Sequence, residues 1–229
     1  MPQQSQIRSL FNNIAPHYDG LNHIMSLGID SCWRRRAVKK IADKNRVQRI
    51  LDIATGTGDF AIAIAKKAHQ DSKIIGIDIA ENMLEIGRRK VPSQVELHLG
   101  SAEKTDFEND CFDVVSIAFG VRNFENLDIA LAEIYRILKN KGKLVILELS
   151  YPNSKILLVL YKLYALHFLP FIGGLISGDK SAYTYLPQSI LKFPKEETFI
   201  QLLQNAGFQN AEYKKFTLGT CLMYVAEKP

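Results

Sequence analysis

The chain has 229 residues, of which 47% are hydrophobic and 23% are charged, and its formal net charge is +5. These values are typical of a globular protein and argue against a disordered chain, and the length suits a single domain over residues 1–229. The three cysteines lie far apart and are odd in number, which argues against a metal site and a disulfide framework. No apolar stretch near the start resembles a signal peptide, so we expect a cytoplasmic protein. We also expect no bound metal, because no pair of cysteines has the spacing of metal ligands.

Residues 1–45 are predicted to form an N-terminal helical cap. Between Arg34 and Ala42, basic and apolar residues are mixed at helical spacing. The apolar residues able to share one face are Trp33, Ala37, Val38 and Ile41. The basic residues from Arg34 to Lys40 can form a solvated helix face or contact anionic lipid headgroups. No aromatic residues interleave with a basic strand, so we do not expect a nucleic-acid partner.

Residues 46–150 alternate short apolar runs with amphipathic segments. The runs predicted to be strands are Val47–Ile53, Lys73–Asp78, Val95–Leu99, Phe112–Phe119 and Lys143–Leu149. The segments predicted to be helices are Asp59–Ala68, Glu81–Arg89 and Leu127–Leu138. Alternation of this kind predicts an α/β fold, with a mostly parallel sheet and helices on both faces.

Residues 151–194 interrupt this alternation with a largely apolar segment. Ile156–Ile176 is nearly long enough to span a bilayer, but charged and helix-breaking residues such as Lys162 and Pro170 interrupt it. We therefore expect a helical insertion that forms a lid over the mouth of the active site. An ordinary buried helix pair is the alternative.

Residues 195–229 are predicted to complete the fold with one helix and a pair of strands. The helix is Lys195–Asn205, and the strands are Tyr213–Thr217 and Cys221–Ala226. Together with the five earlier strands, this pair predicts a seven-stranded sheet that ends in an antiparallel pair.

A glycine-rich turn follows the first predicted strand. Gly56 and Gly58 stand one residue apart, which lets the backbone approach a ligand closely, and with Phe60-Ala61 they fit a dinucleotide-binding pattern. Asp78 ends the second strand, where a carboxylate can accept hydrogen bonds from both hydroxyls of a ribose. These residues do not distinguish a nicotinamide cofactor from S-adenosylmethionine, because both contain an adenosine ribose.

Two further acidic side chains favour S-adenosylmethionine. Asp52 lies inside the first strand and Asp59 follows Gly58, so both carboxylates would repel a diphosphate and attract the ammonium and sulfonium of S-adenosylmethionine. Turn hydrogen bonds and helix capping are the alternative for these two residues. After the third strand, Ser101 and Ala102 can read the edge of an adenine through a backbone amide.

Longer motifs run from about residue 10 to the end of the chain. The general ones are Leu51-Asp52 with Gly56 and Gly58, Asp78, Phe112–Val115 and Leu138–Leu144. The more specific ones are Phe11–Asp19, Trp33-Arg34, Ala118–Asn123, Leu147–Ser150, Tyr183–Ile190 and Phe193-Pro194. The first set resembles class I methyltransferases, and the second resembles the menaquinone/ubiquinone C-methyltransferase family.

The resemblance implies a Rossmann-like fold and transfer of a methyl group from S-adenosylmethionine to a ring carbon of a prenylated quinol. Thr57, Asp78, Ser101 and Ala102 match positions that bind the cofactor in the family. Ser101 stands where Asp or Asn is usual, and Ala118 stands where some members have a serine that contacts the cofactor.

We expect demethylmenaquinol as the substrate, with a benzoquinol of the ubiquinone pathway as the alternative. Three other hypotheses stay open. They are an NAD-dependent dehydrogenase, a non-catalytic quinone-binding module, and a methyltransferase for another small molecule or for RNA. Intact Asp52, Gly56, Gly58 and Asp78 argue against the non-catalytic module.

Methylation of a ring carbon requires alignment of two reacting centres and removal of a hydroxyl proton. The candidates for proton handling are His17, Tyr18, Asp19, Arg122 and Asn123. We expect Arg122 to stabilise the phenolate as a cation, because a guanidinium resists deprotonation. The base is then His17 or a water held by Asn123. An ion pair of Arg122 with Glu125 or Asp128 is the alternative.

The substrate is expected to be long and apolar. Ile156–Ile176 and Tyr183–Leu186 are predicted to line its tunnel or to dip into the edge of a membrane, with the Arg34–Lys40 face nearby. We therefore expect transient contact with the inner face of a membrane. A homodimer or a biosynthetic complex stays open.

Overall fold

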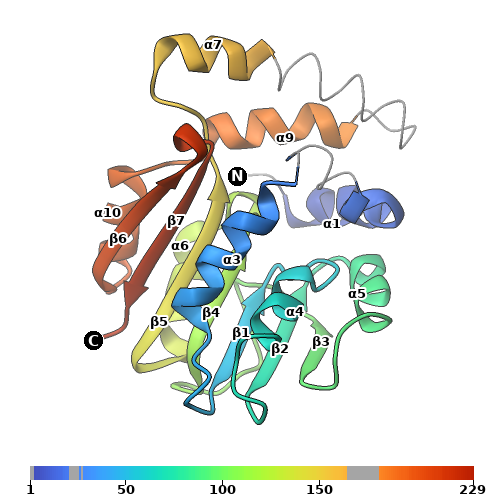
Figure 1. Cartoon of the computed structure of the whole chain (residues 1–229), viewed down its shortest axis with the longest axis vertical. Helices are drawn as coiled ribbons and strands as arrows, with labels where there is room; N and C mark the ends of the chain where they lie inside the picture. Colours follow the sequence, from blue (N-terminus) through green and yellow to red (C-terminus); the bar gives the residue numbers. More distant parts are fainter. Residues whose placement is uncertain (1–2, 21–25, 27, 164–180) are drawn as a thin grey trace.

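The computed structural model describes residues 3–20, 26, 28–163 and 181–229, and a seven-stranded sheet forms the centre of this described part (Figure 1). The strands are β1 (Arg49–Ile53), β2 (Lys73–Asp78), β3 (Val95–Leu99), β4 (Phe112–Ala118), β5 (Leu138–Leu149), β6 (Gln209–Phe216) and β7 (Cys221–Glu227). Their spatial order is β3-β2-β1-β4-β5-β7-β6. Strands β1 to β5 are parallel, whereas β7 runs antiparallel to both β5 and β6. The predicted fold class is therefore confirmed.

Helices pack on both faces of the sheet (Figure 1). The described helices are α1 (Gln4–Ile14), α3 (Asp30–Ile41), α4 (Asp59–Ala65), α5 (Glu81–Arg88), α6 (Leu127–Ile137), α7 (Lys155–Leu163), α9 (Ser181–Lys192) and α10 (Glu197–Asn205). Three short 3-10 turns are η1 (Ala15–His17), η2 (Val121–Asn123) and η4 (Thr217–Gly219). One buried cluster joins α3 and α4 to the sheet, and the other joins α6 and α10 to its opposite face.

Strand β1 shows why this sheet is buried on both sides. Ile50 belongs to the cluster under α3 and α4, whereas Leu51 belongs to the cluster under α6 and α10, and both side chains are fully buried. Successive side chains of a strand point to opposite faces, so a continuous apolar run fits a strand that is covered twice. The carboxyl ends of the parallel strands are then free to carry polar groups.

Helix α3 belongs to the sheet-packing layer, whereas α1 lies over the carboxyl ends of the strands (Figure 1). The apolar face predicted for α3 is confirmed, because its members are all buried: Trp33, Ala37, Val38 and Ile41. The basic residues of α3 do not share one face. Arg35, Lys39 and Lys40 are exposed, whereas only 14% of the Arg34 side chain is accessible.

Two strands begin earlier than their apolar patterns predict. Strand β5 begins at Leu138 rather than Lys143, and a register shift against β4 accommodates the exposed residues between these positions. Strand β6 begins at Gln209 rather than Tyr213. The added segments are mostly polar and exposed, so pairing with a neighbouring strand extends them without an apolar signal in the sequence.

The apolar region after β5 forms α7 and α9, which lie at the end of the molecule that α1 also covers (Figure 1). Residues 164–180 lie outside the described residues, and with them most of the predicted Ile156–Ile176 segment. In the part of the chain that the structure describes, no helix has the length and apolar character needed to cross a membrane. Ile156, Val159 and Leu163 of α7 are exposed.

Candidate active site

The turn between β1 and α4 brings backbone amides to the carboxyl edge of the sheet. Gly56 (φ +58°) and Gly58 (φ +83°) adopt the left-handed conformation, which glycine reaches without strain. A Cβ on Gly58 would lie 2.9 Å from Cγ1 of Val91, so this glycine also permits close packing of the turn. The sharp turn leaves the backbone of Gly56 facing the end of β2.

Asp78 organises this turn from the end of β2. One carboxylate oxygen accepts a hydrogen bond from the amide of Gly56 at 2.8 Å, and the other accepts one from the amide of Ala80 at 2.8 Å. Burial raises the pKa of Asp78 above its usual value, and hydrogen bonds from the backbone amides of Ala80, Gly56 and Ile79 oppose this shift. Each oxygen keeps a second lone pair, so the carboxylate can also accept the two hydroxyls of a ribose.

Asp52 is a second carboxylate below the same turn, and it is almost completely buried. Its oxygens accept hydrogen bonds from the hydroxyls of Thr55 at 2.7 Å and Ser116 at 2.6 Å. Burial raises the pKa of Asp52 to about 6, against the opposing effect of these hydrogen bonds. A cationic ligand nearby would favour its ionised form, so the site suits a positively charged group.

Two adjoining hollows lie above these carboxylates. The first is lined by residues of α1, β2, η2 and the turn after β3, among them Asp78, Ser101, Ala102 and Asn123. The second is lined by Arg34, Asp52, Thr57 and Asp59, among others. Both are bordered by Tyr18, Gly56, Ala118 and Phe119, so they meet beneath the Tyr18 side chain.

The hollows have volumes of about 70 and 30 Å³. Pockets for small molecules usually measure about 300–1,000 Å³, so each hollow is smaller than a usual ligand pocket. Tyr18 lies over the turn, because a Cβ on Gly56 would come within 3.9 Å of its ring. Tyr18 borders both hollows, and with the adjacent Asp19 it forms what we call the Tyr18 segment.

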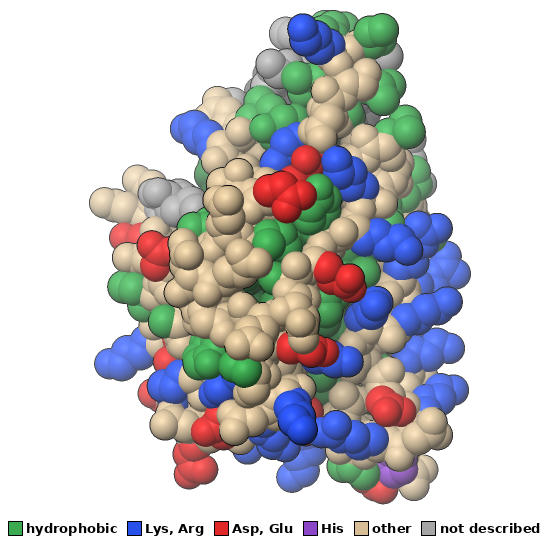
Figure 2. All heavy atoms as spheres, turned by 90° about the vertical axis from the view of Figure 1, so that its left-hand side faces the viewer, with side chains coloured by type: hydrophobic (Ala, Val, Ile, Leu, Met, Phe, Trp, Pro, Cys, Tyr) green, Lys and Arg blue, Asp and Glu red, His purple; other side chains and the backbone are tan. Residues whose placement is uncertain are grey.

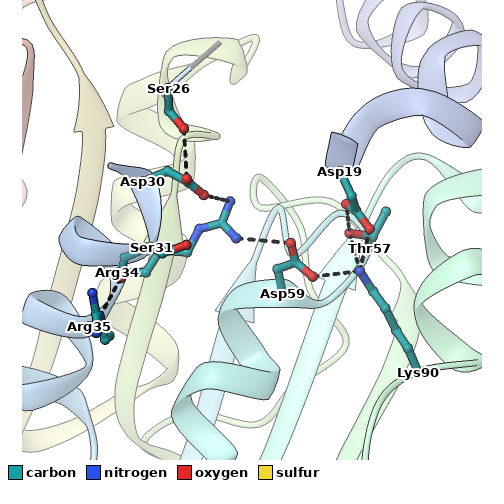
Figure 3. Close-up of polar contacts among 9 residues, drawn as sticks. All are labelled: Asp19, Ser26, Asp30, Ser31, Arg34, Arg35, Thr57, Asp59 and Lys90. Atoms are coloured by element: carbon teal, nitrogen blue, oxygen red, sulfur yellow. Dashed lines mark hydrogen bonds and ion pairs between the residues drawn. The ribbon is translucent and has the colours of Figure 1, made fainter. Parts of the chain in front are cut away.

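A chain of ion pairs links the Tyr18 segment to α4 and α3 (Figure 3). Asp19 accepts hydrogen bonds from the hydroxyl of Thr57 and from Nζ of Lys90, each at 2.6 Å. Lys90 also contacts Asp59 at 2.6 Å, and these contacts lower the pKa of Asp59 below its usual value in spite of its partial burial. Asp59 continues to Nη1 of Arg34 at 3.1 Å. The sequence offered no local signal for Lys90, because its partners lie 31 and 71 positions away.

The cofactor candidates meet at this edge with one exception. The residues that line one or both hollows are Asp52, Gly56, Thr57, Asp78, Ser101, Ala102 and Ala118. Gly58 does not line either hollow and instead precedes α4 as its N-cap. The hydroxyl of Ser101 accepts a hydrogen bond from Nε2 of Gln4 at 2.6 Å, which links α1 to the turn after β3.

The catalytic candidates separate into two groups. Tyr18 lines both hollows and Asn123 lines the first, whereas His17 is exposed and lines neither. Oδ1 of Asn123 accepts a hydrogen bond from the hydroxyl of Tyr185 in α9 at 2.8 Å. Burial raises the pKa of Tyr185, so its hydroxyl stays protonated as a donor. The structure thus brings Tyr18 and Asn123 together at the hollow and leaves His17 outside.

Arg122 is buried, and its side chain is held by several acceptors. Nη1 lies 2.6 Å from Oε1 of Glu148 and also contacts the carbonyl of Phe119, and Nε lies 3.3 Å from the hydroxyl of Ser189. The alternative pairing with Glu125 or Asp128 is wrong, because the partner is Glu148 in β5. The sequence feature that marks Glu148 is its position as an acidic residue within an apolar strand.

Three comparisons bear on this site. Residues 2–228 match the model of the ubiE/COQ5 methyltransferase family. A demethylmenaquinone methyltransferase of Bacteroides fragilis is 43% identical over 99% of this chain and 94% of that relative. A ubiquinone/menaquinone biosynthesis C-methyltransferase of Citrifermentans bemidjiense is 44% identical over 97% of this chain and 96% of that relative.

The fold alone is shared more widely. The structure of an S-adenosylmethionine-dependent methyltransferase of Thermotoga maritima, a possible histamine N-methyltransferase, superposes with a TM-score of 0.68. The two sequences are 20% identical, and the match covers 96% of this chain and 99% of that one. With a family model that matches almost every residue, and with relatives above 40% identity over nearly their full length, the chain belongs to the ubiE/COQ5 methyltransferase family.

Proposed function

We propose that this chain transfers the methyl group of S-adenosylmethionine to a ring carbon of demethylmenaquinol and so forms menaquinol. The observation that carries the proposal is the pair of carboxylates, Asp52 and Asp78, which line two adjoining hollows, of which the one that Asp78 lines is largely apolar. The name of the Bacteroides fragilis relative supports the naphthoquinol as substrate. The name of the Citrifermentans bemidjiense relative favours a benzoquinol as the second candidate.

The charges at the glycine turn fit this methyl donor better than a nicotinamide cofactor. A diphosphate at the start of α4 would meet Asp52, Asp59 and Asp19, whose cationic neighbours are already paired with carboxylates. S-adenosylmethionine carries positive charge on its sulfonium and ammonium groups and supplies a methyl group activated by the sulfonium. Asp78 would hold the ribose, and the backbone at Ala102 would contact the adenine.

Asn123 is the residue proposed to act on the quinol. Because the hydroxyl of Tyr185 donates to Oδ1 and Asn123 lines the first hollow, the amide nitrogen of Asn123 would be the group that donates to a substrate oxygen. A hydrogen bond to the phenolate oxygen stabilises the form of the ring whose neighbouring carbon is nucleophilic. We propose that the hydroxyl proton leaves through a water held near Asn123, since His17 does not line the hollow.

Apolar side chains complete the first hollow and would exclude bulk water from the reaction. They include Ile7 and Phe11 from α1, Met83 from α5, and Phe119 and Phe124 on either side of η2. An apolar wall also suits the ring and the first part of a prenyl chain. Water exclusion strengthens the hydrogen bond from Asn123 to a developing phenolate.

We further propose that α7 contacts the inner face of a membrane, from which a prenylated substrate can be reached. Its residues Ile156, Val159 and Leu163 are each more than half exposed. Figure 2 shows hydrophobic side chains at the end of the molecule that α7 forms, while Lys and Arg side chains gather along the side that α3 forms. The membrane contact would therefore depend on apolar insertion of α7 more than on the basic residues of α3.

The test of the reaction uses the purified chain, S-adenosylmethionine, and reduced forms of a demethylnaphthoquinone and a demethylbenzoquinone. We expect a mass increase of one methylene unit on the naphthoquinol, and no product from Asp78→Ala. Calorimetry with S-adenosylhomocysteine, and with NAD as a control, is run on the same preparations. Binding of S-adenosylhomocysteine without methylation of either quinol would contradict the proposed substrate, and binding of NAD instead would contradict the cofactor.

The test of the membrane contact is sedimentation with lipid vesicles. We expect the double variant Ile156→Glu/Val159→Glu to lose most of its binding to vesicles. Val47→Glu is the matched control, because Val47 is 55% exposed and precedes β1 at the opposite end of the sheet. Equal binding by the wild type and the α7 variant would rule out this surface.

A further inference from the structure

Arg34 has a distinctive position in the site. Among the described residues that line the two hollows, Arg34 is the one cationic side chain, whereas five lining residues are acidic. It reaches the second hollow from α3 and does not belong to the glycine-rich motif at the start of α4. Figure 3 shows its guanidinium between Asp30 and Asp59.

The two hollows suit the two ends of S-adenosylmethionine, which is the proposed methyl donor. Asp78, Ser101 and Ala102 line the first hollow, so the adenosine belongs there. The amino-acid end then lies in the second hollow, beside Asp52 and the glycine turn. This end carries a carboxylate as well as an ammonium, and a carboxylate among acidic side chains requires a cationic partner.

The guanidinium of Arg34 has hydrogen-bonding capacity that its present contacts do not use. Nη1 contacts Asp59 at 3.1 Å, and Nη2 contacts Asp30 at a longer distance of 3.5 Å. Its Nε is buried and has no hydrogen-bond partner within the described part of the chain. A buried N–H without a partner is costly, so a ligand oxygen in reach of Nε would be favourable.

Arg34 can turn towards a ligand without leaving Asp59 unpaired, because Lys90 also contacts Asp59, at 2.6 Å. The guanidinium lies 5.7 Å from the centre of the Phe119 ring, which borders both hollows. A planar guanidinium can bind a carboxylate through two parallel hydrogen bonds, which a lysine cannot do.

We propose that Arg34 binds the carboxylate at the amino-acid end of S-adenosylmethionine. The inference rests on the proposed methyl donor and adds the residue that recognises its carboxylate. Arg34 then contributes to selection of S-adenosylmethionine over related molecules that lack this group. It also links the ligand to the ion pairs that hold the Tyr18 segment, since Asp59 joins Arg34 to Lys90.

The test compares two ligands that differ in one group, S-adenosylmethionine and decarboxylated S-adenosylmethionine. Calorimetry is run with both ligands on the wild type, Arg34→Met and Arg34→Lys. We expect Arg34→Met to weaken S-adenosylmethionine binding tenfold or more (about 1.4 kcal/mol) and to change binding of the decarboxylated ligand less than twofold. Arg34→Lys should lie between the wild type and Arg34→Met, because it keeps the charge but loses the paired hydrogen bonds.

Arg35→Met is the matched control, because Arg35 is the next residue of α3 and its side chain is exposed and bonds to the carbonyl of Ser31. This variant should bind both ligands as the wild type does. Equal weakening of both ligands in Arg34→Met would overturn the inference, since Arg34 would then act on the fold of the site. An unchanged affinity for S-adenosylmethionine would overturn it as well. If the wild type bound neither ligand, the proposed methyl donor would itself be wrong.

Discussion

The glycine turn and the η2 turn border the same hollow, but contacts of different range hold them. Asp78 bonds to backbone amides of Gly56 and Ala80 at the edge of the sheet. The η2 turn instead depends on Glu148 from β5 and on Tyr185 and Ser189 from α9. The sheet thus preforms the cofactor side, whereas the side that carries Asn123 is complete only when α9 is docked.

The largest effect is expected from removal of the cation within η2, Arg122. Arg122→Met leaves Glu148 buried without its ionic partner, so we expect the free energy of unfolding to fall by about 3–5 kcal/mol in urea titrations. The double variant Arg122→Met/Glu148→Gln should recover part of this loss, because it removes the buried charge. A loss below about 1 kcal/mol would mean that the η2 turn is held in some other way.

The cofactor side is expected to respond to pH through Asp52, whose pKa burial raises to about 6. A cationic ligand favours the carboxylate, so binding expels the proton, and affinity falls as the pH drops below 6. At pH 5 about a tenth of Asp52 is ionised, so we expect S-adenosylmethionine to bind about tenfold more weakly than at pH 7.5. The change is measured by calorimetry.

Asp52→Asn provides the control for this pH response. The charged groups that act on Asp52 are Arg34, which lowers its pKa, and Asp78, which raises it. Both remain in the variant, so a flat pH response there would assign the proton to Asp52. A response that persists unchanged would assign it to another group such as Asp78.

A smaller effect is expected where α9 meets Asn123. Tyr185→Phe removes the hydrogen bond to Oδ1 of Asn123 and leaves the ring in position, so kcat should fall about five- to tenfold, the equivalent of one hydrogen bond. The KM for S-adenosylmethionine should stay within twofold, because the cofactor side is built separately. Tyr213→Phe, which removes a bond to Glu197 on the surface, is the control. A rise in this KM with an unchanged kcat would contradict the conclusion that the two sides of the hollow are built separately.

The smallest effect is expected from Lys90→Met, which releases Asp19 from the chain of ion pairs. Partly exposed ion pairs contribute less than about 1 kcal/mol, so we expect the dissociation rate of S-adenosylhomocysteine to rise about threefold in stopped-flow experiments. Arg88→Met, which removes a surface pair with Glu81 near the same helix end, should leave this rate unchanged. A slower rate in Lys90→Met would show that the pairs do not restrain the Tyr18 segment.

The sheet and the cofactor edge could be predicted from local sequence patterns. The strands Lys73–Asp78 and Val95–Leu99 have the predicted bounds, and Gly56 and Asp78 meet as their positions after β1 and β2 require. Apolar runs of this kind determine burial within a few residues, and parallel strands bring their carboxyl ends to one edge. The polar start of β6 could not be predicted this way, because only its pairing with β7 makes it a strand.

The choice of ionic partners was decided by the tertiary structure. Arg34 belongs to a basic run that is typical of a solvated helix face, yet it turns inward to Asp59, 25 positions away. Arg122 pairs with Glu148 rather than with the nearer acids Glu125 and Asp128. Which residues are charged, and in which elements they lie, could be read from local sequence patterns. The attraction between two charges has no preferred direction and is strongest at short distance. Which charged side chains form pairs therefore depends on how segments distant in the sequence pack together.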